Sequence, residues 1–220
     1  MLKSIFVAEI IDLLRSVNAI ITDSHFVFTS GKHGDVYINK DALYPHTTIT
    51  AQVCQILAKK CAHLDIETVV APALGGIILS QWLAYYLSQE KKKEIYGVYA
   101  EKGPDKTFLF TRGYDKFVKG KKILVVEDLS TTGGSVKKVV DVVRANGGQV
   151  VGVCVMVNRN PREVNNAFFG AELIAGAEFE VGAWEADDCP LCKKKIPINT
   201  AVGHGKKYLE SLNKKSPAKL

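Results

Sequence analysis

The chain has 220 residues, of which 47% are hydrophobic and 24% are charged, and its formal net charge at pH 7 is +6. This length suffices to bury a sizeable core, either as one domain with an appendage or as two small domains. The positive charge permits an anionic ligand, but it is concentrated in lysine runs typical of solvated surfaces, without the interleaved aromatic residues of a nucleic-acid stacking surface. No apolar run approaches the roughly 20 residues that span a bilayer, so neither nucleic acid nor a membrane is an expected partner.

The N-terminal segment predicts an amphipathic helix. Phe6, Ile10 and Leu14 recur at helical spacing, whereas Glu9 and Asp12 fall off that stripe. Acidic residues inside the apolar pattern argue against a signal peptide. Residues 25–41 then predict two short strands around a turn at residues 30–32, and a helix is expected over about residues 48–62.

From residue 68 onward the pattern alternates between apolar, β-branched runs and amphipathic segments. Continuous β-branched runs separated by helices are typical of a parallel sheet covered on both faces, so an α/β fold is expected. The expected strands cover residues 68–73, 95–100, 122–128 and 149–157, and the expected helices cover residues 77–89 and 135–148.

A long connection, residues 101–120, separates the second expected strand from the third. Its sequence "FLF" suits one arm of a hairpin. Long connections at the ligand edge of a sheet are often lids or binding loops, so a lid is expected here.

The stretch "ILVVEDLSTTGGS" carries the strongest chemical signal. A buried strand ends in adjacent carboxylates, Glu127 and Asp128, followed by a loop of small residues that opens a helix. Ligands of open α/β sheets bind beyond the carboxyl ends of the strands, and a glycine-rich helix N-terminus binds phosphate. Two carboxylates would repel phosphate unless they bind something else, such as ribose hydroxyls, directly or through Mg²⁺. The stretch therefore predicts a phosphoribosyl site rather than a plain strand, turn and helix cap.

"VVEDLSTTGGS" resembles the phosphoribosyl diphosphate (PRPP) signature of the type I phosphoribosyltransferases. "HFVFTSGKHGDVYINKDALYPHT", "APALGGIILS", "YAEK", "FTRGY" and "VCVMVNR" follow the order found in orotate phosphoribosyltransferases, and the late "CPLC" matches one branch of them. The resemblance covers most of residues 23–159. It implies a type I phosphoribosyltransferase-like parallel sheet flanked by helices, with a core at about residues 48–160 and a small hood from residues 20–45 and 161–200, all in one domain.

The resemblance also implies the activity and its residues. The expected reaction is transfer of 5-phosphoribosyl from PRPP to orotate, which gives orotidine 5-phosphate and diphosphate in UMP biosynthesis, with Mg²⁺ held through PRPP and possibly Asp128. Lys102, Lys106 and Asp128 are the expected catalytic residues. The expected PRPP-binding residues are Ala73, Leu74, Gly75, Gly76, Lys102, Glu127, Asp128, Leu129, Ser130, Thr131, Thr132, Gly133, Gly134 and Ser135. The expected orotate-binding residues are Thr29, Lys32, Val36, Tyr37, Thr131 and Arg159.

The lid departs from the pattern of the family. "AEKGPDK" has Ala100 and Glu101 where basic residues often stand, and it has no histidine. Lys106 or Arg112 can substitute, so the catalytic lysine is open. A lid that reaches the neighbouring subunit's site, as the family's does, implies a homodimer. Two alternatives remain: a salvage phosphoribosyltransferase for another base, and a non-catalytic regulator that senses PRPP.

The five cysteines do not form the pattern of a disulfide framework, so the cytoplasm is the expected compartment. Two of them form the lone CxxC of "CPLCKKK". A zinc site needs two further ligands, and His204 is the only histidine near this motif in the sequence, unless a second subunit supplies the rest. Structural thiols, a metal site and a redox pair therefore all remain open for Cys189 and Cys192.

Overall fold

A computed structural model describes the backbone of residues 2–105, 107–180 and 182–215, and the side chains of residues 9–105, 107–180 and 182–212. The chain divides into two compact units. The first comprises Met1–Leu13 and Tyr44–Glu180, and the second comprises Leu14–Leu43 and Val181–Leu220. Each unit therefore contains segments from distant parts of the sequence.

The first unit contains a six-stranded sheet with the strand order β10-β9-β8-β5-β6-β7. All neighbouring pairs are parallel except β6 and β7, which form a hairpin. Because the parallel strands run in one direction, their carboxyl ends share one edge of the sheet. The strands are β5 (Thr68–Pro72), β6 (Tyr96–Lys102), β7 (Phe108–Leu109), β8 (Lys122–Ser130), β9 (Gln149–Asn158) and β10 (Glu172–Glu178).

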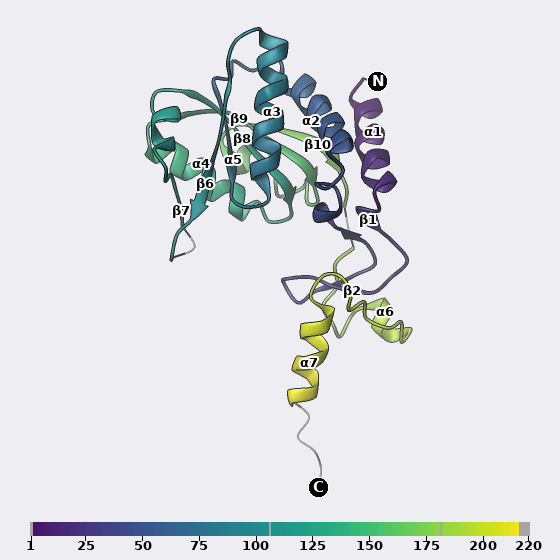
Figure 1. The fold of residues 1–220 in the computed structure, drawn as a ribbon. Helices are drawn as coiled ribbons and strands as arrows, with labels where there is room; N and C mark the ends of the chain where they lie inside the picture. The colour runs from purple at the N-terminus through teal and green to yellow at the C-terminus, as the bar shows by residue number, and fades with distance from the viewer. Residues whose placement is uncertain (1, 106, 181, 216–220) are drawn as a thin grey trace. The chain divides into compact units, whose positions relative to one another are not determined.

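Helices cover both faces of this sheet. α2 (Thr47–Cys61) and α3 (Gly76–Lys91) pack side by side on one face, and α4 (Gly134–Ala145) packs on the other (Figure 1). Val125 and Val155 point toward α4 and join a buried cluster with its Val139 and Val143. Side chains of alternate strand residues face opposite sides, so a strand covered on both faces is apolar throughout. The expected α/β fold with a parallel sheet flanked by helices is confirmed.

The sheet extends one strand further than the sequence analysis predicted. β10 pairs with β9 in parallel, after the short helix α5 (Asn166–Phe169). Residues 161–180, expected in the hood, therefore lie in the unit that contains the sheet. β10 is an edge strand with exposed Glu172 and Glu178 at its ends and an apolar stretch interrupted by glycine, so its pattern is weaker than that of the central strands.

The second unit is built from short elements. β2 (Phe26–Val27) and β3 (His33–Gly34) form an antiparallel hairpin, as residues 25–41 predicted, and the Phe28 backbone N–H donates to the Lys32 carbonyl at 2.8 Å. The remaining elements of this unit were not predicted individually. They are β1 (Ile20–Ile21), β4 (Tyr37–Ile38), the 3₁₀ helix Lys40–Ala42, α6 (Pro190–Lys193) and α7 (Gly205–Lys215).

The N-terminal helix α1 (Leu2–Ser16) has the expected amphipathic character. Ile10 and Leu14 are buried and Glu9 and Asp12 are exposed, whereas Phe6 lies outside the described side chains. Within the part of the chain that the structure describes, no helix is both long and apolar enough to cross a bilayer.

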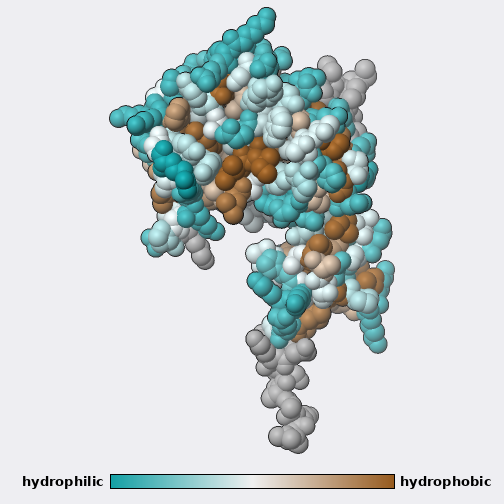
Figure 2. Space-filling view, in the orientation of Figure 1, coloured by the Kyte–Doolittle hydropathy of each residue, from teal (hydrophilic) through white to brown (hydrophobic). Residues whose placement is uncertain are grey.

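Apolar surface gathers on one part of the first unit. Figure 2 shows it as a brown patch over the N-terminal part of α3. The large apolar side chains that are exposed on α3 and on the loop before it are Leu74, Ile78 and Tyr85, and Leu74 is 84% exposed.

Candidate active site

The carboxyl end of β8 carries the two adjacent acids predicted from the sequence. Glu127 is 7% exposed and Asp128 is 3% exposed, so both carboxyl groups lie within the sheet edge rather than on the open surface. The Asp128 Oδ1 accepts a hydrogen bond from the Leu129 backbone N–H at 2.6 Å, and the Glu127 Oε1 accepts one from the Asp128 N–H at 3.1 Å. Ionised carboxylates act only as acceptors, so both side chains are chemically suited to sugar hydroxyls or a cation.

The loop after these acids leads directly into α4. Thr131, Thr132 and Ser135 are exposed, and the first-turn N–H groups of a helix have no acceptor within the helix. Gly133 has a φ of +71°, and a Cβ at this position would lie 2.5 Å from Cε1 of Phe168. Only glycine fits this left-handed turn beneath the aromatic ring. The loop thus presents N–H and hydroxyl donors to solvent, as a phosphate site requires.

The loop after β5 lies at the same edge. It comprises Ala73, Leu74, Gly75 and Gly76, and the Ala73 N–H donates to the Ala100 carbonyl at 2.8 Å. Its side chains are small apart from the exposed Leu74, so the backbone is open to an approaching group.

Tyr44 joins the two loops and was not predicted. Its hydroxyl lies 2.7 Å from the Gly75 carbonyl oxygen and 3.1 Å from the Asp128 Oδ2, both of which accept from it. Burial, together with the nearby Asp128 carboxylate, raises the pKa of Tyr44 far above its usual value. Tyr44 therefore remains a neutral hydrogen-bond donor at any working pH and fixes the position of the Asp128 carboxylate.

We expect Tyr44→Phe to lower kcat/KM by about 3- to 10-fold. The lost hydrogen bond to a charged group is worth roughly 1.5–3 kcal/mol, and only the part of this free energy that positions Asp128 affects the reaction. Steady-state kinetics measure this effect. Tyr37→Phe is not a suitable control, because Tyr37 is itself a candidate site residue. Tyr85→Phe changes an exposed tyrosine on α3 in the same way and should leave kcat/KM unchanged. Equal losses in the two variants would contradict the positioning role.

Arg159 lies directly after β9, beside the acidic strand end. Its backbone N–H donates to the Ser130 carbonyl at 2.8 Å, and the residue is half-buried. The structure therefore brings the end of β9 against the end of β8. The predicted acids, the predicted phosphate loop and the predicted arginine all lie at one edge of the sheet.

The predicted lid is a hairpin. Lys102 ends β6, is exposed, and pairs in register with Phe108 of β7. Glu101, the acidic residue in a usually basic position, accepts from the Thr111 hydroxyl at 2.6 Å and from Arg112 Nε at 3.0 Å. These two partners hold the pKa of Glu101 below its usual value. Arg112 is thus engaged in anchoring the hairpin. Lys106 lies outside the described residues.

The remaining predicted base-binding residues lie in the second unit. Thr29 and Lys32 are in the turn between β2 and β3, where the Thr29 hydroxyl lies 3.0 Å from His204 Nε2 and Lys32 forms an exposed ion pair with Glu185. Val36 and Tyr37 are half-buried at the start of β4.

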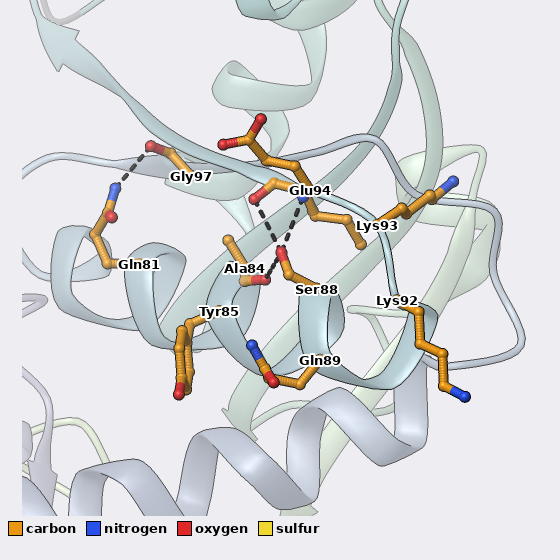
Figure 3. Close-up of a pocket in the computed structure, with 10 residues that line it drawn as sticks. Gln81, Ala84, Tyr85, Ser88, Gln89, Lys92, Lys93, Glu94 and Gly97 are labelled. Atoms are coloured by element: carbon orange, nitrogen blue, oxygen red, sulfur yellow. Dashed lines mark hydrogen bonds between the residues drawn. The ribbon is translucent and has the colours of Figure 1, made fainter.

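A pocket of about 610 Å³ lies elsewhere on the first unit. It is formed by the C-terminal half of α3 and the segment entering β6, and the Ser88 hydroxyl at its centre donates to the Ala84 carbonyl (Figure 3). Ile95 directly before β6 and Gly97 near its amino end line this pocket, whereas the acids and the phosphate loop lie at the carboxyl ends of the strands. This pocket contains none of the predicted site residues.

Known proteins are similar to this chain over most of its length. A family model described as a phosphoribosyl transferase domain matches residues 39–185. The orotate phosphoribosyltransferase of Caldanaerobacter subterraneus subsp. tengcongensis is 34% identical over 192 residues, which cover 87% of this chain and 93% of that relative. The enzyme of the same name from Desulforamulus reducens is 36% identical over 189 residues, covering 86% and 93%.

A solved structure shares the fold. The orotate phosphoribosyltransferase of Mycobacterium tuberculosis H37Rv has a TM-score of 0.62 at 23% sequence identity, with 79% of this chain and 96% of that chain covered. Another structure of the same protein is a complex with PRPP.

Proposed function

We propose that this chain, which belongs to the orotate phosphoribosyltransferase family of the phosphoribosyltransferases, transfers the 5-phosphoribosyl group of PRPP to orotate. The bond between the anomeric carbon and the diphosphate oxygen breaks, and its electron pair leaves with diphosphate. The orotate nitrogen loses its proton and bonds to the anomeric carbon. The products are orotidine 5-phosphate and diphosphate, a step of UMP biosynthesis.

One observation carries the proposal: two buried acids, an exposed phosphate-type loop and an arginine share one edge of the sheet. Glu127 and Asp128 accept hydrogen bonds from the ribose hydroxyls. Beyond them, the loop residues bind the 5-phosphate through backbone N–H and hydroxyl groups. This loop comprises Thr131, Thr132, Gly133, Gly134 and Ser135, and Leu129 and Ser130 at the end of β8 are further PRPP-binding candidates.

The diphosphate lies against the β5–α3 loop. Ala73, Leu74, Gly75 and Gly76 offer backbone groups there, and Lys102 and Lys106 of the hairpin supply positive charge. Transition-state charge on a departing diphosphate is stabilised by such preorganised cations. Closure of the hairpin excludes water, which would otherwise hydrolyse PRPP.

Mg²⁺ fits the donor set at the end of β8. Glu127 and Asp128 place carboxylate oxygens at this edge of the sheet, and such oxygens are ligands that Mg²⁺ prefers. Held by PRPP, with Asp128 as a candidate ligand, Mg²⁺ supplies positive charge that neutralises the diphosphate.

The proposed assembly is a homodimer in which the hairpin of one subunit completes the site of the other. The brown patch of Figure 2 supports an apolar contact surface on the first unit, where Leu74 and Ile78 are exposed. Light scattering of the purified protein measures the mass of the assembly.

The five cysteines are unpaired with one another, which supports a reducing compartment, the cytoplasm.

Arg159 of the first unit is proposed to recognise orotate through its carboxylate, with Thr131 beside it. Thr29, Lys32, Val36 and Tyr37 of the second unit are orotate-binding candidates on the resemblance alone. A guanidinium pairs with a carboxylate in a bidentate geometry. Nucleobases without a carboxylate cannot form this pair. This pairing separates the orotate reaction from salvage of another base.

We expect Arg159→Ala to raise the KM for orotate by about 10- to 100-fold, because a charge-assisted bidentate pair is worth roughly 1.5–3 kcal/mol. The KM for PRPP should change little. Arg162→Ala is the matched control, since Arg162 lies three residues later, its side chain is 83% exposed, and it forms a surface ion pair with Glu180. An equal rise of both KM values in Arg159→Ala would contradict the assignment.

The test of the reaction is the orotate absorbance change on mixing the purified protein with PRPP, orotate and Mg²⁺. We expect a decrease that requires all three. PRPP binding without turnover of orotate or of any other base would instead identify a sensor that has lost catalysis.

A further inference from the structure

Four side chains that the proposed reaction does not use converge in the second unit. They are His25, His33, Cys189 and Cys192, and one ligand atom from each lies within 4.8 Å of all the others. The Cys192 Sγ is 3.3 Å from the His33 Nδ1 and 3.8 Å from the His25 Nε2, and the Cys189 Sγ is 3.6 Å from the same His25 nitrogen. The two ring nitrogens are 2.8 Å apart.

These residues come from two distant segments. His25 precedes β2 and His33 begins β3, so the hairpin contributes both histidines. Cys189 directly precedes α6 as its N-cap, and Cys192 lies within this helix. Backbone pairing holds the segments together, because His25 forms a bridge with Ile198 and His33 one with Trp184. The cluster is therefore built by the fold rather than by chance rotamers.

The spacing suits a tetrahedral zinc ion. Zn–S bonds of about 2.3 Å and Zn–N bonds of about 2.0–2.1 Å place sulfur and nitrogen ligands roughly 3.6 Å apart and two nitrogens roughly 3.3 Å apart. The three sulfur–nitrogen distances, 3.3, 3.6 and 3.8 Å, match this geometry. The histidine nitrogens need to separate by only about 0.5 Å to admit the ion.

The orientation of His25 also fits a metal ligand. Its Nδ1 lies 2.8 Å from the Ile196 carbonyl oxygen, which can only accept, so Nδ1 carries the proton and donates. Nε2 then presents its lone pair to the cluster. Metal-bound histidines usually donate their second N–H to a carbonyl or carboxylate in this way, which fixes the tautomer and the ring orientation.

Burial favours an ion of this charge. His25 is 1% exposed, and His33 and Cys189 are fully buried. Two thiols lose their protons when they bind zinc, so the cluster of two thiolates, two neutral imidazoles and one Zn²⁺ is electrically neutral. A neutral, fully coordinated centre avoids the cost of a buried unpaired charge. Mg²⁺ and Ca²⁺ prefer oxygen ligands, which the cluster lacks.

We propose that His25, His33, Cys189 and Cys192 bind a structural Zn²⁺ ion that clamps the β2–β3 hairpin to the segment around α6. Four protein ligands complete the coordination and leave no position for a substrate, which distinguishes a structural site from a catalytic one. The turn that carries Thr29 and Lys32 lies between the two histidine ligands, so the clamp also holds this turn. His204, the histidine nearest the CxxC in sequence, instead bonds to Thr29.

The metal content of the full-length protein, purified under reducing conditions and dialysed, tests the proposal. Elemental analysis should find about one zinc ion per chain, because a closed Cys₂His₂ site retains zinc tightly. Cys192→Ser and His33→Ala should remove most of it. His204→Gln, which changes a histidine of the same unit outside the cluster, should keep it.

A second measurement does not depend on whether the variants fold. Co²⁺ added to wild-type protein stripped of metal should give the intense visible absorption of a tetrahedral thiolate site, and Zn²⁺ should abolish it. Removal of zinc should also lower the melting temperature by roughly 4–8 °C, since metal that binds only the folded state stabilises it. The proposal would be overturned if the protein contained no zinc and gave no such Co²⁺ spectrum, or if a Cys189–Cys192 disulfide took the place of the metal. Equal loss of zinc in His204→Gln and His33→Ala would also overturn it.

Discussion

Asp128→Asn is expected to lower kcat/KM by about 100- to 1000-fold, because hydrogen bonds to a charged group contribute roughly 1.5–3 kcal/mol each and the carboxylate is proposed to accept from ribose hydroxyls. The substitution is nearly isosteric. The Asn Oδ1 can still accept from the Leu129 N–H, and its Nδ2 can donate to the Tyr44 oxygen while the Tyr44 proton turns to the Gly75 carbonyl. The local network survives, so the variant removes charge and acceptor capacity without disturbing the fold.

The absorbance assay with saturating orotate and varied PRPP measures this loss. Asp141→Asn is the matched control, because Asp141 lies on α4, is exposed, and pairs with Lys137 one turn away. It should retain full activity, since exposed ion pairs contribute little. If Asp128→Asn stays within about threefold of the wild-type kcat/KM, the ribose role of Asp128 is wrong.

The central sheet was predictable because its strands are buried on both faces. "VVAP" in β5 and "ILVV" in β8 are continuous apolar runs, and within each strand no exposed residue interrupts them. β10 was not predicted because it lies at the edge of the sheet, where exposed positions introduce polar residues into the strand pattern. The extent of the two units was also beyond local sequence patterns, because the second unit joins Leu14–Leu43 with Val181–Leu220, segments more than 100 residues apart.

The candidate site was predictable where its residues are consecutive. Glu127 and Asp128 and the loop after them form one motif, so their proximity follows from chain connectivity. Tyr44 and the four-residue cluster depend on tertiary contacts instead. Tyr44 lies 84 positions from Asp128, and His25 lies 164 positions from Cys189. The CxxC motif marks Cys189 and Cys192 in the sequence, but no local pattern distinguishes Tyr44, His25 or His33 from ordinary core or surface positions.

Gly133→Ala is expected to raise the KM for PRPP by at least about 10-fold, because the substitution disturbs the turn that shapes the phosphate loop. A non-glycine residue in the left-handed region costs roughly 1–2 kcal/mol. The new Cβ would also lie 2.5 Å from Cε1 of Phe168, so either the ring or the loop must move. Movement of about 1 Å at a phosphate-binding backbone misaligns several N–H donors at once.

Gly120→Ala is the control, because it introduces the same backbone strain at a position away from the phosphate loop. Gly120 has the same φ of +71°, but a Cβ there meets no atom within 4 Å, and it lies before β8, at the opposite end of that strand from the acids. The Gly120→Ala variant should lose a similar amount of thermal stability to Gly133→Ala, yet keep the wild-type KM for PRPP. Adding Phe168→Ala to Gly133→Ala tests the clash itself: relief of the overlap should restore part of the PRPP affinity, whereas additive losses would show that the loop does not depend on this contact. The phosphate loop is then defined by packing beneath it as well as by its own sequence.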